Sequence, residues 1–376
     1  MKRNVIALML LLLSSTSWAQ GWKLVVTRNN GTTIEAMTSD VKDITFVKEN
    51  DDTPTLPDKN ADQIIIKEVY VGGCPKDEGT EFFQQDKCII LYNNCPQQAV
   101  VNNLCIAFAT PYNSNSRNDN YTEDGHLVYE ADDFTPAQNG IWYYPRSLVF
   151  EPYGQVVINV CGAIDNTKTY SQSVNYANAD YYCMYDPESG YNQTSYYPTP
   201  ADVIPTSHYW RAAKYGQATA WPLSSNSPAL FIYQPKGTTP VEHATDPDQL
   251  WYPVGAAQTP VYACIRVPND WIIDAVEVFN AAQKEDNMKR LTADLDAGYV
   301  YLTNKLGHTL YRNVEREETE ALPENKGKLV YNYSLGDDPS GIDAEASIAA
   351  GAHIVYQDYN DSSSDFHERQ KCSLRK

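Results

Sequence analysis

The sequence lacks any apolar run, after its first residues, that could span a membrane. The one uninterrupted apolar stretch is Val5–Leu13, preceded by Lys2 and Arg3 and followed by a small, polar segment ending Ser17-Trp18-Ala19. A spanning helix needs about 20 such residues, so this run is too short for an anchor. A basic start, a short apolar run and a small-residue cleavage site are typical of a signal peptide. We therefore expect residues 1–19 to be cleaved, and the mature chain to be secreted, periplasmic or on the cell surface without membrane insertion.

Basic residues are also scarce. The chain has 29 Lys and Arg against 48 Asp and Glu, a formal net charge of −19. Such a charge repels phosphate backbones and anionic lipid headgroups. Nucleic acid and bare membrane are therefore poor candidate partners, although acidity also simply keeps an exported protein soluble.

Familiar catalytic and cofactor motifs are missing. The sequence contains no G-x-S-x-G, no H-E-x-x-H, no G-x-x-x-x-G-K-[ST] and no G-x-G-x-x-G. The six histidines are scattered, which argues against a locally built transition-metal site, and we expect no cofactor. Two oxygen-rich segments are candidate calcium loops: Asp119-Asn120 with Glu123-Asp124-Gly125, and Asp358, Asn360, Asp361 with Asp365. We interpret both segments as solvated loops rather than calcium sites, because calcium needs six or more converging oxygens.

The chain has eight cysteines but no C-x-x-C, so it carries no zinc-ribbon or thioredoxin-type signal. Export places these cysteines where disulfides persist. Four of them fall between Cys74 and Cys105, and we expect at least one bridge there, with the connectivity left open. A chain of this length does not need disulfides to fold, so others can be buried thiols.

The pattern divides the chain into a signal peptide (1–19), a small β leader module (20–48), a linker (49–62) and a main domain (63–376). In the leader module, Lys23–Thr27 and Thr33–Met37 favour strands around the turn residues Asn29-Asn30-Gly31, and Asp43–Val47 favours a third strand. The linker is charged, contains proline and has almost nothing to bury.

The sequence pattern predicts that the main domain is mainly β. Apolar runs of strand length recur between turn-forming residues, and short helices are expected only near 343–351 and 177–185. The runs are Ile64–Tyr70, Cys88–Tyr92, Val100–Phe108, Gln155–Cys161, Ala229–Tyr233 and Pro260–Val267. Many short strands joined by turns favour a β-sandwich with long loops.

Residues 181–221 are unusually aromatic and are punctuated by prolines. Long ordered loops are often functional, and aromatic faces stack on sugar rings or on protein partners. The competing interpretation, that these rings pack the loop onto the sandwich, is the commoner case for buried aromatics. We predict a solvent-exposed ligand-binding shelf, with Trp210 as its first member. Its candidate residues are Tyr191, Tyr196, Tyr197, Tyr209 and Trp210.

Several segments together resemble lamin-tail-like domains. Ile64–Tyr70 (IIIKEVY), Cys88–Asn94 (CIILYNN) and Leu104-Cys105-Ile106 are similar to the opening strands of such domains, and Val267–Phe279 resembles a later strand. Arg290, the segment Asp296–Tyr299 and the ending Asn360–Arg369 resemble one branch, a domain-of-unknown-function family of exported proteins from Bacteroidales-type bacteria. Residues 22–47 separately resemble a leader module of such exported proteins.

This resemblance covers about residues 62–376 and implies an immunoglobulin-like, lamin-tail-like β-sandwich, but no reaction. It also predicts a core strand at Trp271–Phe279. The chain departs from the pattern at Ile90, where a glutamate is usual, and at Cys88, where an aromatic residue is usual. Cys88, Ile90 and Tyr92 share one strand face, opposite Ile89 and Leu91, so both faces are apolar and we expect this strand to be central.

The sequence therefore favours a secreted or surface-exposed, non-catalytic binding protein whose partner is a glycan or another surface protein. Two alternatives stay open. One is a secreted hydrolase with a carboxylate pair in an aromatic-lined cleft, which predicts convergent acids in a pocket. The other is a structural part of a surface assembly, which predicts a flat interface or an open sheet edge.

Overall fold

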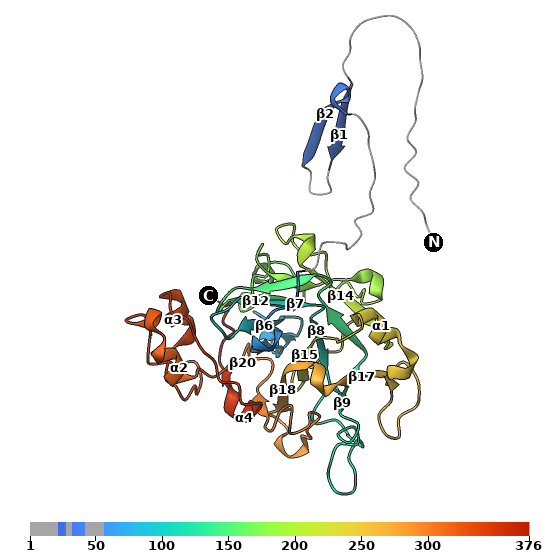
Figure 1. The fold of residues 1–376 in the computed structure, drawn as a ribbon, viewed down its shortest axis with the longest axis vertical. Helices are drawn as coiled ribbons and strands as arrows, with labels where there is room; N and C mark the ends of the chain where they lie inside the picture. The colour runs from blue at the N-terminus through green and yellow to red at the C-terminus, as the bar shows by residue number, and fades with distance from the viewer. Residues whose placement is uncertain (1–21, 28–31, 42–55, 376) are drawn as a thin grey trace, which may run out of the picture. The chain divides into compact units, whose positions relative to one another are not determined.

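The computed structural model describes residues 22–27, 32–41 and 56–375 of the chain (Figure 1). The chain forms two compact units, residues 1–50 and 51–376. In the described ranges, no helix has both the length and the apolar character needed to cross a bilayer.

The smaller unit contains an antiparallel hairpin of β1 (Lys23–Thr27) and β2 (Thr33–Met37), followed by a short 3-10 turn at Thr38–Asp40. The two predicted strands of the leader module are therefore present, and the predicted third strand, Asp43–Val47, lies outside the described residues. A lone hairpin has no second layer to cover it, so apolar side chains such as Val25, Val26 and Ile34 are half exposed.

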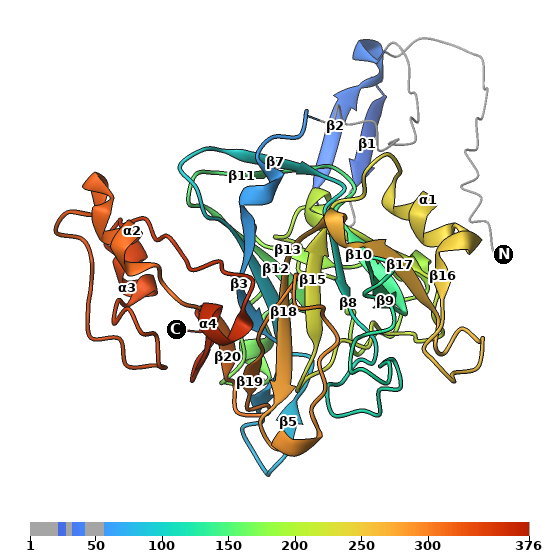
Figure 2. The same ribbon diagram turned by 60° about the horizontal axis from the view of Figure 1, so that its bottom comes forward.

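The larger unit is built on one twelve-stranded sheet that is nearly barrel-shaped (Figure 2). Its strands pair antiparallel except at β18–β19, β12–β13 and β13–β14. In spatial order they are β19 (Val300–Leu302), β18 (Ile272–Asn280), β15 (Ala229–Tyr233), β8 (Cys105–Phe108), β10 (Gly140–Tyr143), β14 (Tyr209–Lys214), β13 (Tyr182–Met184), β12 (Gln155–Cys161), β6 (Lys87–Asn93), β3 (Ile64–Tyr70), β20 (Thr309–Arg312) and β21 (Phe366–Arg369). The two edge strands approach each other, and the backbone N–H of Thr303, just after β19, donates to Glu368 of β21 at 2.8 Å.

Smaller elements surround this sheet. Three small sheets pair β11 (Ser147–Phe150) with β7 (Ala99–Asn102), β4 (Cys74–Pro75) with β5 (Phe82–Phe83), and β17 (Cys264–Pro268) with both β16 (Leu250–Trp251) and β9 (Phe134–Gln138). The α-helices are α1 (Pro240–Thr245), α2 (Arg316–Ala321), α3 (Ala344–Ala349) and α4 (Ser362–Asp365). Figures 1 and 2 show α2 and α3 together on one side of the unit and α1 on the opposite side.

The hydrophobic core lies on both faces of the large sheet. In β6, Ile89 and Leu91 belong to the largest apolar cluster, whereas Cys88 and Ile90 pack in a separate cluster on the other face. Every residue of β6 is buried, and the strand lies between β12 and β3. The prediction of a central strand with two apolar faces is confirmed, because side chains alternate across the pleat.

The structure confirms a mainly β protein but not an immunoglobulin-like sandwich. A single hydrogen-bonded ladder continues through all twelve strands, rather than dividing into two stacked sheets. The predicted core strand near 271–279 is confirmed as β18, and the helix expected near 343–351 is α3. The helix expected near 177–185 is wrong, since Tyr182–Met184 forms β13 instead.

The second half of the expected linker is part of the larger unit. Lys59 forms a β-bridge with Val100, and the Asp58 carboxylate accepts a hydrogen bond from the backbone N–H of Asn102 at 2.7 Å. Residues 49–55 lie outside the described residues. The sequence does not predict this backbone pairing, because the segment has few apolar side chains.

The bridge expected among Cys74, Cys88, Cys95 and Cys105 is not found, because all eight cysteines are free thiols. Their side chains lie in different surroundings. Cys88 packs beside Tyr70 and Cys372, whereas Cys105 belongs to the cluster that contains Tyr233. Burial raises the pKa of both thiols, so they are neutral core groups.

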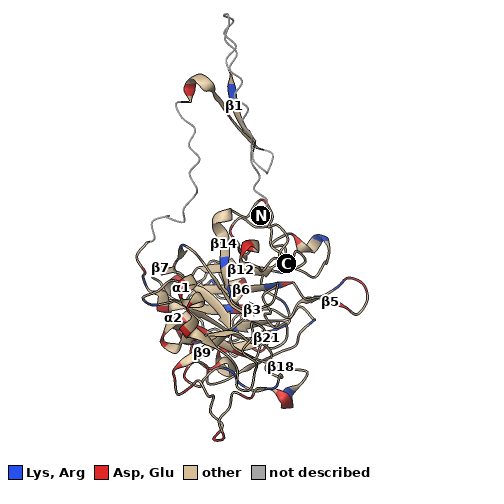
Figure 3. Ribbon diagram, turned by 90° about the vertical axis from the view of Figure 1, so that its right-hand side faces the viewer, with Lys and Arg blue, Asp and Glu red and all other residues tan. Residues whose placement is uncertain are grey.

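Charged residues are spread over the surface of the described chain rather than gathered into one field. Figure 3 shows acidic residues on α2 and on the loop beside β5, among other separate places. This distribution fits the interpretation of acidity as a solubility feature.

Candidate functional site

Three of the five residues predicted to form an exposed shelf are core residues. Tyr191, Tyr197 and Trp210 are 0%, 4% and 0% exposed. Tyr191 stacks on Trp142 with ring centroids 5.6 Å apart, and its hydroxyl donates to the Asn139 carbonyl at 3.0 Å. Burial raises the pKa of Tyr191 well above its ordinary value. The predicted shelf is therefore wrong for these three rings, because the aromatic segment packs inward against the sheet.

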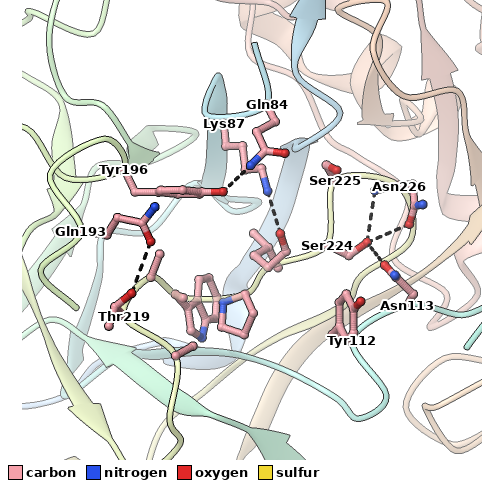
Figure 4. Close-up of a pocket in the computed structure, with 15 residues that line it drawn as sticks. Gln84, Lys87, Tyr112, Asn113, Gln193, Tyr196, Thr219, Ser224, Ser225 and Asn226 are labelled. Carbon is pink, nitrogen blue, oxygen red and sulfur yellow. Dashed lines mark hydrogen bonds between the residues drawn. The ribbon is translucent and has the colours of Figure 1, made fainter. Parts of the chain in front are cut away.

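Tyr209 and Tyr196 have different surroundings. Tyr209 is half-buried at the start of β14, in an edge-on contact with Tyr185 at 5.5 Å, and burial raises its pKa to about 12. Tyr196 is also half-buried, but it lines a cavity of about 460 Å³ (Figure 4). Of the five candidates, only Tyr196 reaches this cavity.

The cavity is formed where four loops converge beside Lys87, the first residue of β6. It is bounded by the segment entering β6, the loop after β8, the aromatic segment after β13, and the long loop between β14 and β15. Its lining residues are Gln84, Lys87, Tyr112, Asn113, Gln193, Tyr196, Ala218, Thr219, Ala220, Trp221, Pro222, Leu223, Ser224, Ser225 and Asn226.

Hydrogen bonds fix the aromatic side of the cavity. The Gln84 side-chain amide donates to the Tyr196 hydroxyl, and the Thr219 hydroxyl donates to the Gln193 amide oxygen at 3.3 Å. The Thr219 carbonyl accepts from the backbone N–H of Gln193 at 3.2 Å. Tyr196 and Gln193 are thus held by two separate loops, and Figure 4 shows both side chains at the same side of the cavity.

The opposite side is a turn built on Ser224. The Ser224 hydroxyl accepts from the backbone N–H of Ser227 at 2.9 Å and interacts with the amide oxygens of Asn113 and Asn226. The Ser224 hydroxyl is therefore held inside the turn by contacts within the chain. Its contacts with the two amide oxygens place both asparagine side chains beside the cavity.

Lys87 supplies the one charge among the lining residues. It is 5% exposed, and its ammonium donates to the Leu223 carbonyl at 2.6 Å. Burial lowers the pKa of Lys87, since a charged group loses hydration there. All fifteen lining residues belong to the described chain, and they include no carboxylate, histidine or cysteine.

Amides and hydroxyls make up most of the polar lining of the cavity. Amides and hydroxyls pair with the hydroxyl groups of a polar ligand, and a tyrosine ring can contact its apolar face. Pockets for small ligands typically measure about 300–1,000 Å³, and this cavity falls within that range.

A second cavity, of about 770 Å³, lies where the two edge strands of the large sheet approach each other. Its wall includes His308, whose Nδ1 lies 2.8 Å from the Glu368 carboxylate. His367 lies in the same wall between Asn313 and Tyr333, and burial lowers its pKa to about 4. A carboxylate that orients a histidine is an arrangement that general-base catalysis uses.

In the two candidate calcium loops, acidic side chains bind groups of the protein itself. Asp119 accepts from Arg117 at 2.8 Å, and Asp358 accepts from the buried Arg312 at 2.9 Å. Asp361 caps α4 by accepting from the Ser363 N–H. Within 22–27, 32–41 and 56–375 there is no cluster of three or more acidic, histidine or cysteine side chains placed to hold a metal.

Sequence reasoning missed most of the residues around Tyr196. Gln84, Asn113 and Thr219 are loop residues that lie far apart in the sequence. No sequence motif indicates that they meet in the folded chain. The sequence contains one signal, because Lys87 is the first residue of a strand that is otherwise largely apolar on both faces. A lysine in that position must reach solvent, a carboxylate or a polar cavity.

Comparisons with known proteins place the fold but not the activity. Residues 151–337 match a family described as "Protein of unknown function (DUF4876)". The chain is similar to the crystal structure of a DUF4876 family protein from Bacteroides thetaiotaomicron, with a TM-score of 0.57 and 18% sequence identity over 81% of this chain and 70% of that chain. No curated protein matches the sequence. The expected likeness to an unknown-function family of such bacteria is thus found, whereas the relation to lamin-tail-like domains is not.

Proposed function

We propose that this chain is a secreted or surface-exposed, non-catalytic protein that binds a glycan in the cavity beside Tyr196. The observation that carries the proposal is the composition of that cavity: a half-buried tyrosine among amides and hydroxyls, without an acid or a histidine. Sugars present hydroxyl groups at their edges and C–H groups on their faces, so such a wall complements them. Export through cleavage of residues 1–19 and a lamin-tail-like ancestry belong to this proposal as expectations from the sequence.

A glycan fits the cavity better than a second protein does. A stable protein interface buries about 1,000 Å² or more, mostly on a flat surface. The site at Tyr196 is instead a concavity of about 460 Å³, which is the scale of one or two sugar rings.

The test is a glycan-array screen of residues 20–376, followed by calorimetry on each glycan bound. Tyr196→Ala should weaken binding about tenfold or more, because it removes the aromatic contact. Tyr209→Ala is the matched control, since Tyr209 is also half-buried but lies outside the cavity. Equal affinities for the two variants, or no glycan bound at all, would contradict the proposal.

A second candidate function is a secreted hydrolase. The sequence predicts a carboxylate pair for it, whereas the observation that favours it is the His308–Glu368 pair in the second cavity. In that case the chain should hydrolyse glycosides or esters, and His308→Ala should abolish turnover without changing the fold. Absence of turnover on a broad panel of chromogenic glycosides and esters counts against it.

A further inference from the structure

Among residues 22–27, 32–41 and 56–375, Lys87 is a buried cation with no carboxylate paired to it. Five lysine and arginine side chains are buried among the described residues: Lys67, Lys87, Arg290, Arg312 and Arg369. Three of the other four pair directly with a carboxylate, and Arg369 lies in the field of Glu68 and Glu345, whereas the titratable group acting on Lys87 is the Cys161 thiol.

The compensation of the other cations is direct in three cases. Lys67 lies 2.8 Å from Glu345, Arg290 lies 2.5 Å from Glu277, and Arg312 lies 2.9 Å from Asp358. Arg369 is stacked near tyrosine rings and lies in the field of Glu68 and Glu345.

Cys161 does not provide a negative charge for Lys87. The two residues face each other in the ladder between β12 and β6. Burial raises the pKa of the Cys161 thiol to about 11, so the thiol is protonated and neutral at physiological pH.

The Lys87 ammonium is also short of hydrogen-bond acceptors. It carries three N–H donors, and one of them is used by the Leu223 carbonyl at 2.6 Å. No other acceptor for it is found in residues 22–27, 32–41 and 56–375. Figure 4 shows its nitrogen inside the cavity, between Tyr196 and the Ser224 turn.

A buried ammonium without a counter-charge is unfavourable, and a ligand that brings a negative group removes that penalty. We propose that the ligand of this cavity is an acidic glycan, whose anionic group is bound by Lys87 with help from the Gln84 amide. This inference rests on the proposed function and names its ligand class. The chain's net charge of −19 repels an anion at long range. Salt screens exposed charges beyond about 8 Å, so the contact with Lys87 determines whether the cavity binds an anion.

The test compares oligomers of galacturonic acid and of galactose of equal length, with sulfated galactose oligomers as a third arm. The wild-type chain should bind an acidic oligomer about tenfold or more tightly than the neutral one, since charge-assisted hydrogen bonds are the stronger kind. The uronate and sulfate arms show which anionic group the site accepts.

Lys87→Met keeps the length of the side chain and removes its charge, so it should abolish the preference for the acidic oligomer. Lys326→Met, at an exposed lysine outside the cavity, is the control and should leave the preference intact. The wild-type comparison stands even if Lys87→Met fails to fold.

The outcomes separate the two claims. Preference for the neutral oligomer, or a preference that survives in Lys87→Met, overturns the acidic-glycan inference while the glycan-binding proposal stands. Binding of no oligomer here and no glycan on the array overturns the proposed function itself.

Discussion

Replacing Trp210 by alanine should destabilise the larger unit strongly. The ring is fully buried in the largest apolar cluster, with its centroid 5.8 Å from that of Tyr144. Truncation of a buried tryptophan to alanine costs about 3–5 kcal/mol, because it removes apolar contact and leaves a cavity. For a unit of this size, that corresponds to a melting temperature lower by roughly 5–15 °C.

The assay is urea unfolding followed by tryptophan fluorescence and far-ultraviolet circular dichroism. Tyr209→Ala, at the neighbouring position on the opposite strand face, is the control, and its cost should be about 1–2 kcal/mol because the ring is half exposed. A loss below about 1 kcal/mol for Trp210→Ala would refute the core assignment and restore Trp210 as a surface residue.

Three further predictions concern titration, thiols and export. His367 has a folded pKa of about 4, below its ordinary value of 6.5, so the unfolded state binds its proton more readily between those values and stability should fall as pH drops through that window. His367→Gln should lessen this acid sensitivity, by up to about 3 kcal/mol at pH 4, whereas the exposed His126→Gln should not; identical pH profiles would contradict the assignment. Cys95 should react first with a thiol reagent in the folded chain, because the other seven cysteines are buried, and rapid labelling of all eight would refute this. N-terminal sequencing of exported protein should begin at Gln20, and a retained segment 1–19 would refute cleavage.

The strands were predictable because their signal is local. The uninterrupted apolar run Cys88–Tyr92 indicates β6 without knowledge of its neighbours. The strand expected at Trp271–Phe279, observed as β18, followed from the family resemblance together with its β-branched content. The closure of twelve strands into one nearly barrel-shaped sheet was not predictable, since strand order depends on pairings between distant segments. The parallel pairing of β13 with both β12 and β14 is one such case.

The site was less predictable than the fold. Aromatic density correctly drew attention to the segment that contains Tyr196, but composition does not tell an inward ring from an outward one. Trp210 and Tyr209 are adjacent, and the strand pleat alone buries the first and leaves the second half exposed. The polar partners Gln84 and Gln193 come from distant loops, so only the folded chain brings them together.

The most direct measurement is a crystal structure of residues 20–376 with the glycan that binds best. The account predicts a sugar ring against the face of Tyr196, with an anionic group within hydrogen-bonding distance of the Lys87 ammonium. A glycan bound elsewhere, for example beside His308, with the Tyr196 cavity holding only water, would contradict it.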